Sequence, residues 1–336
     1  MALTMARKLI TVIVPVLNEA ATLNGLIDRL SPVLDGLAVR WEVLFVDDGS
    51  TDETLAVLKA FNSRDRRITA ISLSRNFGKE IALAAGLKYA QGDAVILMDA
   101  DLQHPPELLA LFVDRWREGY QIVYGQRLEH TADGPLRRFF SRAYYKIFNA
   151  LANTDIPEGA GDFRLLDRCA IDAMNRIGEV SRFNKGLFSW IGFRTVGVPY
   201  TAAVRTSGIS KWSYRRLARF ALDGLTSFST LPLRVFSLLG LAISLSAFAY
   251  ALIVLAQTLV LGVDVPGYPS LIISVMFFAG VQLISLGVIG EYLGRVYEEV
   301  KARPLFIVSE EIGLSQGAAA PAVRAVPAAA GAKEHM

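Results

Sequence analysis

Two long apolar runs near the C-terminus constrain the fold of this chain more than any other feature. Val235–Leu261 and Ser270–Gly290 carry no charged residue, and each is longer than the roughly 20 residues that a helix needs to cross a bilayer. A hydrophobic content of 52% is high for a soluble protein, and much of the excess lies in these runs. A buried helical hairpin in a soluble core is the alternative. We predict a two-helix transmembrane hairpin over residues 233–294.

Basic residues flank this hairpin on one side only. The linker Gly262–Pro269 has none, whereas the flanks carry Arg215, Arg216, Arg219, Arg234, Arg295, Lys301 and Arg303. The positive-inside rule therefore places both termini and the N-terminal domain in the cytoplasm. Residues 211–232 mix basic and apolar positions at helical spacing, which is typical of juxtamembrane amphipathic helices. We expect a cytoplasmic segment at 295–314 and a disordered tail at 315–336, which is rich in Ala and Pro.

The N-terminal part alternates strand-like and helix-like stretches. The strand-like stretches are Leu9–Pro15, Trp41–Val46, Ile68–Leu73, Ala94–Met98 and Gln121–Tyr124. The intervening stretches have helical patterns, and Ser50 with Glu53 predicts a capping box at the start of one helix. This rhythm predicts an α/β domain with a mostly parallel sheet over residues 1–210. A signal peptide at the N-terminus is disfavoured, because Pro15 interrupts the apolar run and Asn18 and Glu19 close it.

Two acids follow the strand-like run Ala94–Met98. Asp99 and Asp101 are one residue apart, and Gln103 lies two residues further on. Neighbouring carboxylates repel each other unless a cation lies between them, and hard oxygen ligands suit Mg²⁺ or Mn²⁺. A solvated acidic turn is the alternative reading. In a parallel sheet this turn would lie at the carboxyl ends of the strands, where ligands bind.

Several other classes of site are excluded or disfavoured by composition. The net charge of +3 is too small to indicate nucleic-acid binding, and the single Cys169 rules out an internal disulfide or a cysteine metal cluster. Three histidines make a His-built zinc site improbable. No G-x-G-x-x-G follows the first strand and no P-loop motif occurs, so NAD-type and P-loop nucleotide sites are unsupported.

Residues 126–210 are less regular in sequence. Arg127–Asn149 is basic and aromatic and predicts a helix. Glu158–Leu165 predicts a glycine-rich loop that carries Asp162 and Arg164. Ser189–Gly197 and Val198–Arg205 predict two short strands.

In this order the motifs resemble the family 2 glycosyltransferases of GT-A fold, specifically the polyprenyl-phosphate glycosyltransferases. The matching segments are IVPVLNE (13–19), VDDGSTDET (46–54), LSRNFGKE (73–80), MDADLQHPPE (98–107), GDFRLLDR (161–168) and RTSGISKW (205–212), with the membrane pair. The resemblance is strongest to bactoprenol glucosyltransferases and next to dolichyl-phosphate mannosyltransferases. It covers nearly all of residues 8–305. His104 departs from the pattern, because many relatives carry Asp there.

The resemblance implies roles for the matching positions. The nucleotide-sugar would contact Pro15, Asn18, Glu19, Asp47, Asp48, Lys79, Asp99 and Ser210. A divalent cation, Mg²⁺ or Mn²⁺, would be held by Asp99, Asp101 and Gln103. The catalytic residues would be Asp162, Asp101, Arg205 and Lys211, with Arg205, Ser210 and Lys211 gripping phosphates.

The implied reaction is transfer of a sugar from a UDP- or GDP-sugar to polyprenyl phosphate, with inversion, at a bacterial inner membrane. Glucose from UDP-glucose is the expected donor pair, and undecaprenyl phosphate is the expected acceptor. Mannose, N-acetylglucosamine or aminoarabinose is the alternative sugar. An inactive sugar-nucleotide-binding scaffold is the alternative of another class, and formation of a homo-oligomer stays open. A processive polysaccharide synthase is disfavoured, because the chain lacks a QxxRW motif and further membrane helices.

Overall fold

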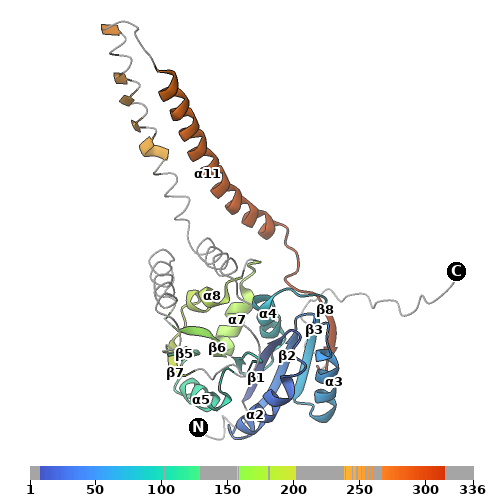
Figure 1. Ribbon diagram of the computed structural model, residues 1–336. Coiled ribbons are helices and arrows are strands. Elements are labelled where there is room, and N and C mark those ends of the chain that lie inside the picture. Colours follow the sequence, from blue (N-terminus) through green and yellow to red (C-terminus); the bar gives the residue numbers. More distant parts are fainter. Residues whose placement is uncertain are drawn as a thin grey trace, which may run out of the picture.

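The computed structural model describes residues 8–128 except 102, residue 157, residues 159–201 except 181, scattered positions from 238 to 260, and residues 267–314. Within this part, eight strands form one sheet in the order β7-β5-β6-β4-β1-β2-β3-β8. Figure 1 shows helices on both faces of this sheet and one long helix, α11, that rises away from it.

The described elements follow the expected alternation over the first half of the chain. The strands are β1 (Leu9–Val16), β2 (Arg40–Asp47), β3 (Ile68–Leu73), β4 (Ala94–Leu97), β5 (Ile122–Arg127), β6 (Ala160–Asp167), β7 (Thr195–Tyr200) and β8 (Val308–Ile312). The helices are α2 (Leu23–Asp35), α3 (Thr54–Arg64), α4 (Lys79–Tyr89), a 3₁₀ turn η1 (Pro106–Leu108), α5 (Leu109–Arg117), α7 (Arg168–Arg176), α8 (Asn184–Trp190) and α11 (Tyr268–Val300). The first five predicted strands are confirmed to within three residues at each end.

The four central strands of the sheet are parallel. β1 pairs in parallel with β2 and β4, and β2 pairs in parallel with β3. Strands β6 and β8 run antiparallel to their neighbours, so four of the seven pairings among the described strands are parallel. The predicted α/β fold with a mostly parallel sheet is therefore confirmed.

Each face of the sheet carries its own hydrophobic core. On one face, Val12 and Val14 of β1 pack with the buried side chains of α2, α3 and α5. On the other face, Ile13 packs with α4, α7 and α8, and with Phe306 and Val308 near the C-terminal end. Alternate side chains of a strand point to opposite faces, so one central strand supplies both cores. Burial on both faces explains the near-continuous apolar sequence of β1 and β4.

The predicted loop over Glu158–Leu165 is wrong, because most of it forms strand β6. β6 pairs antiparallel with β4 on one side and with β5 on the other, so both edges of its backbone are hydrogen-bonded. Its side chains alternate, with Phe163 and Leu165 in one core and Leu166 in the other. Gly159, with φ of +74°, lies in the turn just before the strand, so the glycine indicates this turn and not a loop over the whole segment.

Two further local predictions are wrong. Residues up to Trp190 are helical in α8, so the strand expected over Ser189–Gly197 begins only at Thr195. The capping box is absent from the start of α3. There the Ser50 hydroxyl accepts a hydrogen bond from the Asn18 backbone N–H. The Asp52 carboxylate accepts a hydrogen bond from the Thr54 backbone N–H.

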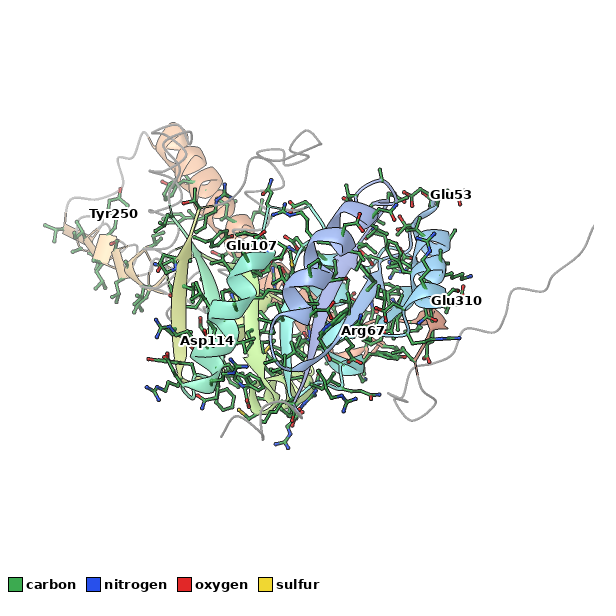
Figure 2. The ribbon with its side chains drawn as sticks, turned by 90° about the horizontal axis from the view of Figure 1, so that it is seen from below. Glu53, Arg67, Glu107, Asp114, Tyr250 and Glu310 are labelled. Carbon is green, nitrogen blue, oxygen red and sulfur yellow. The ribbon has the colours of Figure 1, made fainter. Side chains whose placement is uncertain are left out.

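The C-terminal segment folds back onto the sheet, which the sequence did not indicate. β8 pairs antiparallel with β3, and Ser309 Oγ donates a hydrogen bond to the Ser72 carbonyl. Figure 2 shows Glu310 of β8 beside α3, where Lys59 pairs with it at 2.7 Å. Within the segment expected to be cytoplasmic at 295–314, the first residues continue α11 to Val300 and Val308–Ile312 form an edge strand of the sheet. Its cytoplasmic location stays a prediction.

One described helix is long and apolar enough to cross a membrane. Phe277–Val300 of α11 has a mean hydropathy of 1.4, and none of the tested stretch is buried within the protein. Leu283 is 69% exposed and Leu293 is 65% exposed. This candidate span overlaps the second apolar run from Phe277 to Gly290 and continues beyond it to Val300. The first run is described only at scattered positions, so the two-helix hairpin stays a prediction. So do the helix at Arg127–Asn149, the juxtamembrane helices and the tail.

Candidate functional site

The polar residues after β2 are held by the main chain around them. Asp47 is 1% exposed, and its carboxylate accepts hydrogen bonds from Ser50 N at 3.0 Å and Ser72 Oγ at 2.7 Å. The Asp48 carboxylate accepts hydrogen bonds from the Phe77 and Gly78 backbone N–H groups at 2.7 and 2.9 Å. Burial raises the pKa of Asp48, although these hydrogen bonds oppose the shift. Asp48 thus fixes the loop before α4, and Asp47 fixes the turn after β2 against β3. The contact of either acid with a nucleoside stays a prediction.

The loop after β1 lies against the same region. Asn18 adopts φ of +55°, a backbone geometry that asparagine tolerates better than most side chains. Its Oδ1 accepts a hydrogen bond from Thr51 N at 2.8 Å, and Glu19 N donates to Thr54 Oγ1 at 3.0 Å. Pro15, near the end of β1, pairs in register with Val46 of β2. The predicted nucleoside residues of β1 and β2 therefore share one end of the sheet.

Lys79 joins two acids that are far apart in sequence. It is the first residue of α4, and its ammonium lies 2.6 Å from Asp99 Oδ1 and 2.9 Å from Asp162 Oδ2. The side chain of Asp162 is 14% exposed, that of Asp99 is 29% exposed and that of Lys79 is 41% exposed. The structure therefore brings together three of the predicted site residues, from the ends of β4 and β6 and from α4, in a half-open cluster.

The ion pairs of this cluster stabilise its charged forms. Burial alone would lower the pKa of Lys79, but the carboxylates of Asp99 and Asp162 outweigh it and raise that pKa above its usual range. Burial would raise the pKa of Asp162, but the Lys79 ammonium holds it well below its usual range. Asp162 is therefore ionised at neutral pH. Its Oδ1 is buried and has no hydrogen-bond partner among the described residues.

His104 anchors the turn that carries the other acids. Its Nδ1 accepts a hydrogen bond from the Asp99 backbone N–H at 3.2 Å, and Gln103 N donates to Asp101 Oδ1 at 3.1 Å. The His104 ring stacks on Phe163, with 4.7 Å between centroids and 6° between planes. Burial lowers the pKa of His104, which matches a neutral ring with an accepting Nδ1. Because Phe163 follows Asp162 on β6, this stack connects the Asp99–Asp101 turn to the strand of Asp162.

A second polar group extends the cluster beyond Lys79. Glu80 Oε2 accepts a hydrogen bond from Asn184 N, and the Asn184 side chain donates to the Glu80 carbonyl, both at 3.0 Å. Burial, together with the nearby Asp162 carboxylate, raises the pKa of Glu80 to about 7. Lys185 follows Asn184, and its positive charge acts on both Asp162 and Glu80.

Sequence reasoning missed Glu80, Asn184, Lys185 and any role for His104. The available signal was the polar pair Asn184–Lys185 at the start of an otherwise apolar helix. Three predicted site residues, Arg205, Ser210 and Lys211, lie outside the described residues.

The donor set of the Asp99–Asp101 turn fits a hard divalent cation. Asp99 and Asp101 supply carboxylate oxygens, and Gln103 supplies an amide oxygen. No group of three or more His, Cys, Asp or Glu side chains arranged to share a metal occurs in the described part of the chain. Two carboxylates and an amide leave coordination positions for substrate oxygens, which is how Mg²⁺ is usually held. The Asp99 carboxylate is paired with Lys79, so that residue would have to share it with the cation.

The solved structures that match this chain are distant from it in sequence. A mannosyltransferase from Pyrobaculum calidifontis, in complex with GDP-Man and Mn²⁺, is 18% identical with a TM-score of 0.46, covering 87% of this chain and 88% of that one. A glucosyl-3-phosphoglycerate synthase from Mycobacterium tuberculosis, in complex with Mn²⁺ and UDP-glucose, has a TM-score of 0.41 and covers 66% of this chain and 78% of that one.

Sequence comparisons give much closer relatives. An uncharacterized glycosyltransferase of Synechocystis sp. is 50% identical over 305 residues, which is 91% of this chain and 96% of the relative. A bactoprenol glucosyl transferase of Shigella phage SfV is 40% identical over 302 residues, or 90% of this chain and 98% of the relative. The model of glycosyl transferase family 2 matches residues 11–174. The chain belongs to glycosyl transferase family 2 and is a glycosyltransferase.

Proposed function

We propose that this enzyme transfers a sugar, glucose, from UDP-glucose to a polyprenyl phosphate at the cytoplasmic face of a bacterial inner membrane. The single observation that carries the proposal is the Asp99–Lys79–Asp162 cluster beside Asp101 and Gln103, where the carboxyl end of β4 meets the start of the antiparallel strand β6. Relatives named bactoprenol glucosyl transferase, 40% identical over nearly their whole length, support the lipid acceptor and the sugar.

The chemistry of the acceptor agrees with the state of Asp162. A phosphate monoester has a second pKa of about 6, so it is mostly a dianion at neutral pH and needs no strong base to become a nucleophile. Asp162, whose pKa is held low, is a poor proton acceptor. We assign it the task of positioning the acceptor or the sugar hydroxyls. A single in-line displacement would invert the anomeric centre.

The leaving group requires positive charge. Negative charge builds on the diphosphate as the bond to the sugar breaks, and stabilising it where it develops lowers the barrier. A Mg²⁺ or Mn²⁺ ion held by Asp99, Asp101 and Gln103 would supply this stabilisation as a Lewis acid. Arg205 and Lys211, with Ser210, are the proposed protein partners of the phosphates.

The candidate membrane span in α11 would suit a lipid acceptor. Each buried CH₂ of a polyprenyl chain is worth about 0.8 kcal/mol, so the acceptor stays in the bilayer and the enzyme must meet it there. The span within α11 would keep the domain at the membrane surface. The face of the sheet covered by α4, α7 and α8 is the one nearer α11 (Figure 1).

A donor panel tests the proposal. Purified full-length protein is incubated with undecaprenyl phosphate, Mg²⁺ or Mn²⁺, and each of several labelled UDP- and GDP-sugars, and label in the lipid phase is measured. We expect transfer from UDP-glucose that is lost in Asp101→Ala. Transfer only from GDP-mannose or from an amino sugar would replace the assigned donor. Nucleotide binding without any transfer would favour an inactive scaffold.

A further inference from the structure

We propose that Lys185 binds the phosphate of the lipid acceptor beside Asp162. This inference rests on the proposed function and adds an acceptor-binding residue to it. Lys185 is the second residue of α8, and it follows Asn184, which is fully buried and doubly hydrogen-bonded to Glu80. Since Glu80 directly follows Lys79, the start of α8 is fixed next to the Asp99–Lys79–Asp162 cluster.

The charges of the cluster explain why a second cation is needed. Lys79 is already paired with both Asp99 and Asp162. A phosphate dianion that approaches Asp162 would meet the negative charge of this carboxylate and, above a pH of about 7, that of Glu80 as well. A positive charge on the acceptor side of Asp162, in addition to the cations proposed for the diphosphate, would offset this repulsion.

Lys185 is a cation beside this cluster that is available for this purpose. Within the described part of the chain, its ammonium has no hydrogen bond and no ion pair, although its charge acts on Asp162 and Glu80. Its basic neighbours serve the fold instead. Arg182 donates to the carbonyls of Ile177 and Glu179, and the Arg164 guanidinium lies 4.1 Å from the centre of the Phe188 ring.

The order of groups across the sheet assigns Lys185 to the acceptor and not to the donor. The predicted nucleoside residues lie at the ends of β1 and β2, and the candidate cation ligands follow β4. Asp162 comes next, on β6, and α8 packs against β6. A nucleotide-sugar whose nucleoside binds at β1 and β2 and whose diphosphate binds after β4 would place its sugar near Asp162. Helix α8 would then lie on the far side of the sugar, where the acceptor must approach.

The same helix also adjoins the membrane-facing part of the molecule. Val180, just before α8, donates its backbone N–H to Glu299 Oε1 at the end of α11 at 2.9 Å. Figure 1 places α8 on the side of the domain towards α11. A phosphate attached to a membrane lipid would therefore reach Lys185 from the side on which the lipid lies.

Steady-state kinetics on the full-length enzyme test this assignment. Lys185→Gln should raise the KM for polyprenyl phosphate roughly ten- to a hundredfold, the effect of losing one charge-assisted hydrogen bond, and leave the donor KM unchanged. Lys185→Arg should restore much of the affinity. Lys88→Gln, on an exposed lysine near the far end of α4, is the matched control and should behave as wild type. An unchanged acceptor KM, or an equal rise in both KM values, would overturn the assignment.

Direct binding separates this inference from the proposed function. Farnesyl phosphate, farnesol and inorganic phosphate are titrated into wild type and Lys185→Gln, and thermal unfolding midpoints verify the folding of the variant. We expect wild type to prefer farnesyl phosphate over farnesol, and Lys185→Gln to lose this preference. If Lys185→Gln loses this preference but wild type transfers no sugar from any donor, the phosphate site is retained and the proposed function is refuted. A preference that survives in Lys185→Gln, absence of the preference in wild type, or equal binding of inorganic phosphate would refute the lipid-phosphate site.

Discussion

The aspartates that end β2 and the aspartates that follow β4 occupy comparable places in two parallel strands, with β1 between them. Asp47 and Asp48 are 1% and 4% exposed, and each carboxylate accepts two hydrogen bonds from nearby protein groups. The Asp99 side chain is 29% exposed and pairs with the ammonium of Lys79. Similar acids at one edge of a sheet can therefore have different roles. Asp47 and Asp48 fix the backbone, whereas Asp99 keeps a carboxylate accessible to a ligand.

The partners of each pair explain this difference. Backbone N–H groups cannot move away without unfolding the loop, so the Asp48 carboxylate is needed to keep this loop folded. Lys79 is a flexible cation, and a ligand can take over or share its interaction with Asp99. We therefore expect substitutions of the first pair to reduce stability first, and substitutions of the second pair to reduce turnover first.

The largest effect is expected from Asp101→Asn. Removing this charge from the candidate cation site should lower the rate of sugar transfer by roughly a hundred- to a thousandfold, as loss of a transition-state-stabilising group typically does. The thermal unfolding midpoint should stay close to that of wild type. Radiolabel transfer to lipid measures the rate, and transfer at the wild-type rate would contradict the role of Asp101.

Asp162→Asn should cost somewhat less, roughly a hundredfold in turnover. The amide cannot pair with Lys79 as a carboxylate does, so the acceptor would be misplaced, and the loss should be similar at pH 6 and pH 8. Transfer assays at both pH values measure it. Full recovery at pH 8 would indicate that Asp162 acts as a simple base and not as a positioning group.

Asp48→Asn should chiefly reduce stability. The amide would place an N–H donor against a backbone N–H donor, at a cost of about 2 kcal/mol, which lowers the unfolding midpoint by roughly 4–8 °C for a domain of this size. Asp28→Asn, an exposed position on α2, is the control. An unchanged unfolding midpoint in Asp48→Asn would contradict the stabilising role that distinguishes Asp47 and Asp48 from Asp99 and Asp101.

A smaller effect is expected at His104. His104→Phe keeps an aromatic ring to stack on Phe163 but removes the acceptor of the Asp99 N–H. Loss of one neutral hydrogen bond of about 1 kcal/mol predicts a three- to tenfold lower kcat if the turn is mispositioned. A matched fall in the unfolding midpoint with no change in kcat would show that His104 serves stability alone.

The smallest effect concerns the pH dependence of stability at Glu80. Its pKa is raised from 4.5 to about 7, so between these values the folded chain holds a proton that the unfolded chain has released. The free energy of unfolding therefore falls as pH rises through this range. Glu80→Gln should flatten this part of the profile, whereas Glu53→Gln, an exposed control, should not. An unaltered slope in Glu80→Gln would contradict the shift.

The sequence predicted the elements whose signal is local. β1 and β3 are short apolar runs bounded by polar turns, and their limits in the structure differ from the expected ones by no more than one residue. The motif around Asp99 and Asp101 identified the right edge of the sheet. Pairing of Lys79 with Asp99 and Asp162 was not foreseen, because it depends on β6 lying next to β4.

Elements defined by distant partners escaped prediction. β6 contains Gly161 and charged Asp162 and Arg164, and it becomes a strand only because two antiparallel neighbours enclose it. β8 is short and carries two glutamates, and its partner β3 lies more than two hundred residues earlier in the chain. Neither pairing leaves a periodic signal in the sequence, so only the three-dimensional arrangement reveals them.

One thermal-shift experiment tests the contrast between the two aspartate pairs most directly. Wild type, Asp48→Asn and Asp101→Asn are unfolded with and without Mn²⁺ and UDP. We predict that Asp48→Asn lowers the ligand-free midpoint, and that Asp101→Asn keeps the wild-type midpoint but loses the rise caused by Mn²⁺ and UDP. A ligand-free midpoint that falls as far in Asp101→Asn as in Asp48→Asn, with the ligand-induced rise retained, would contradict the account.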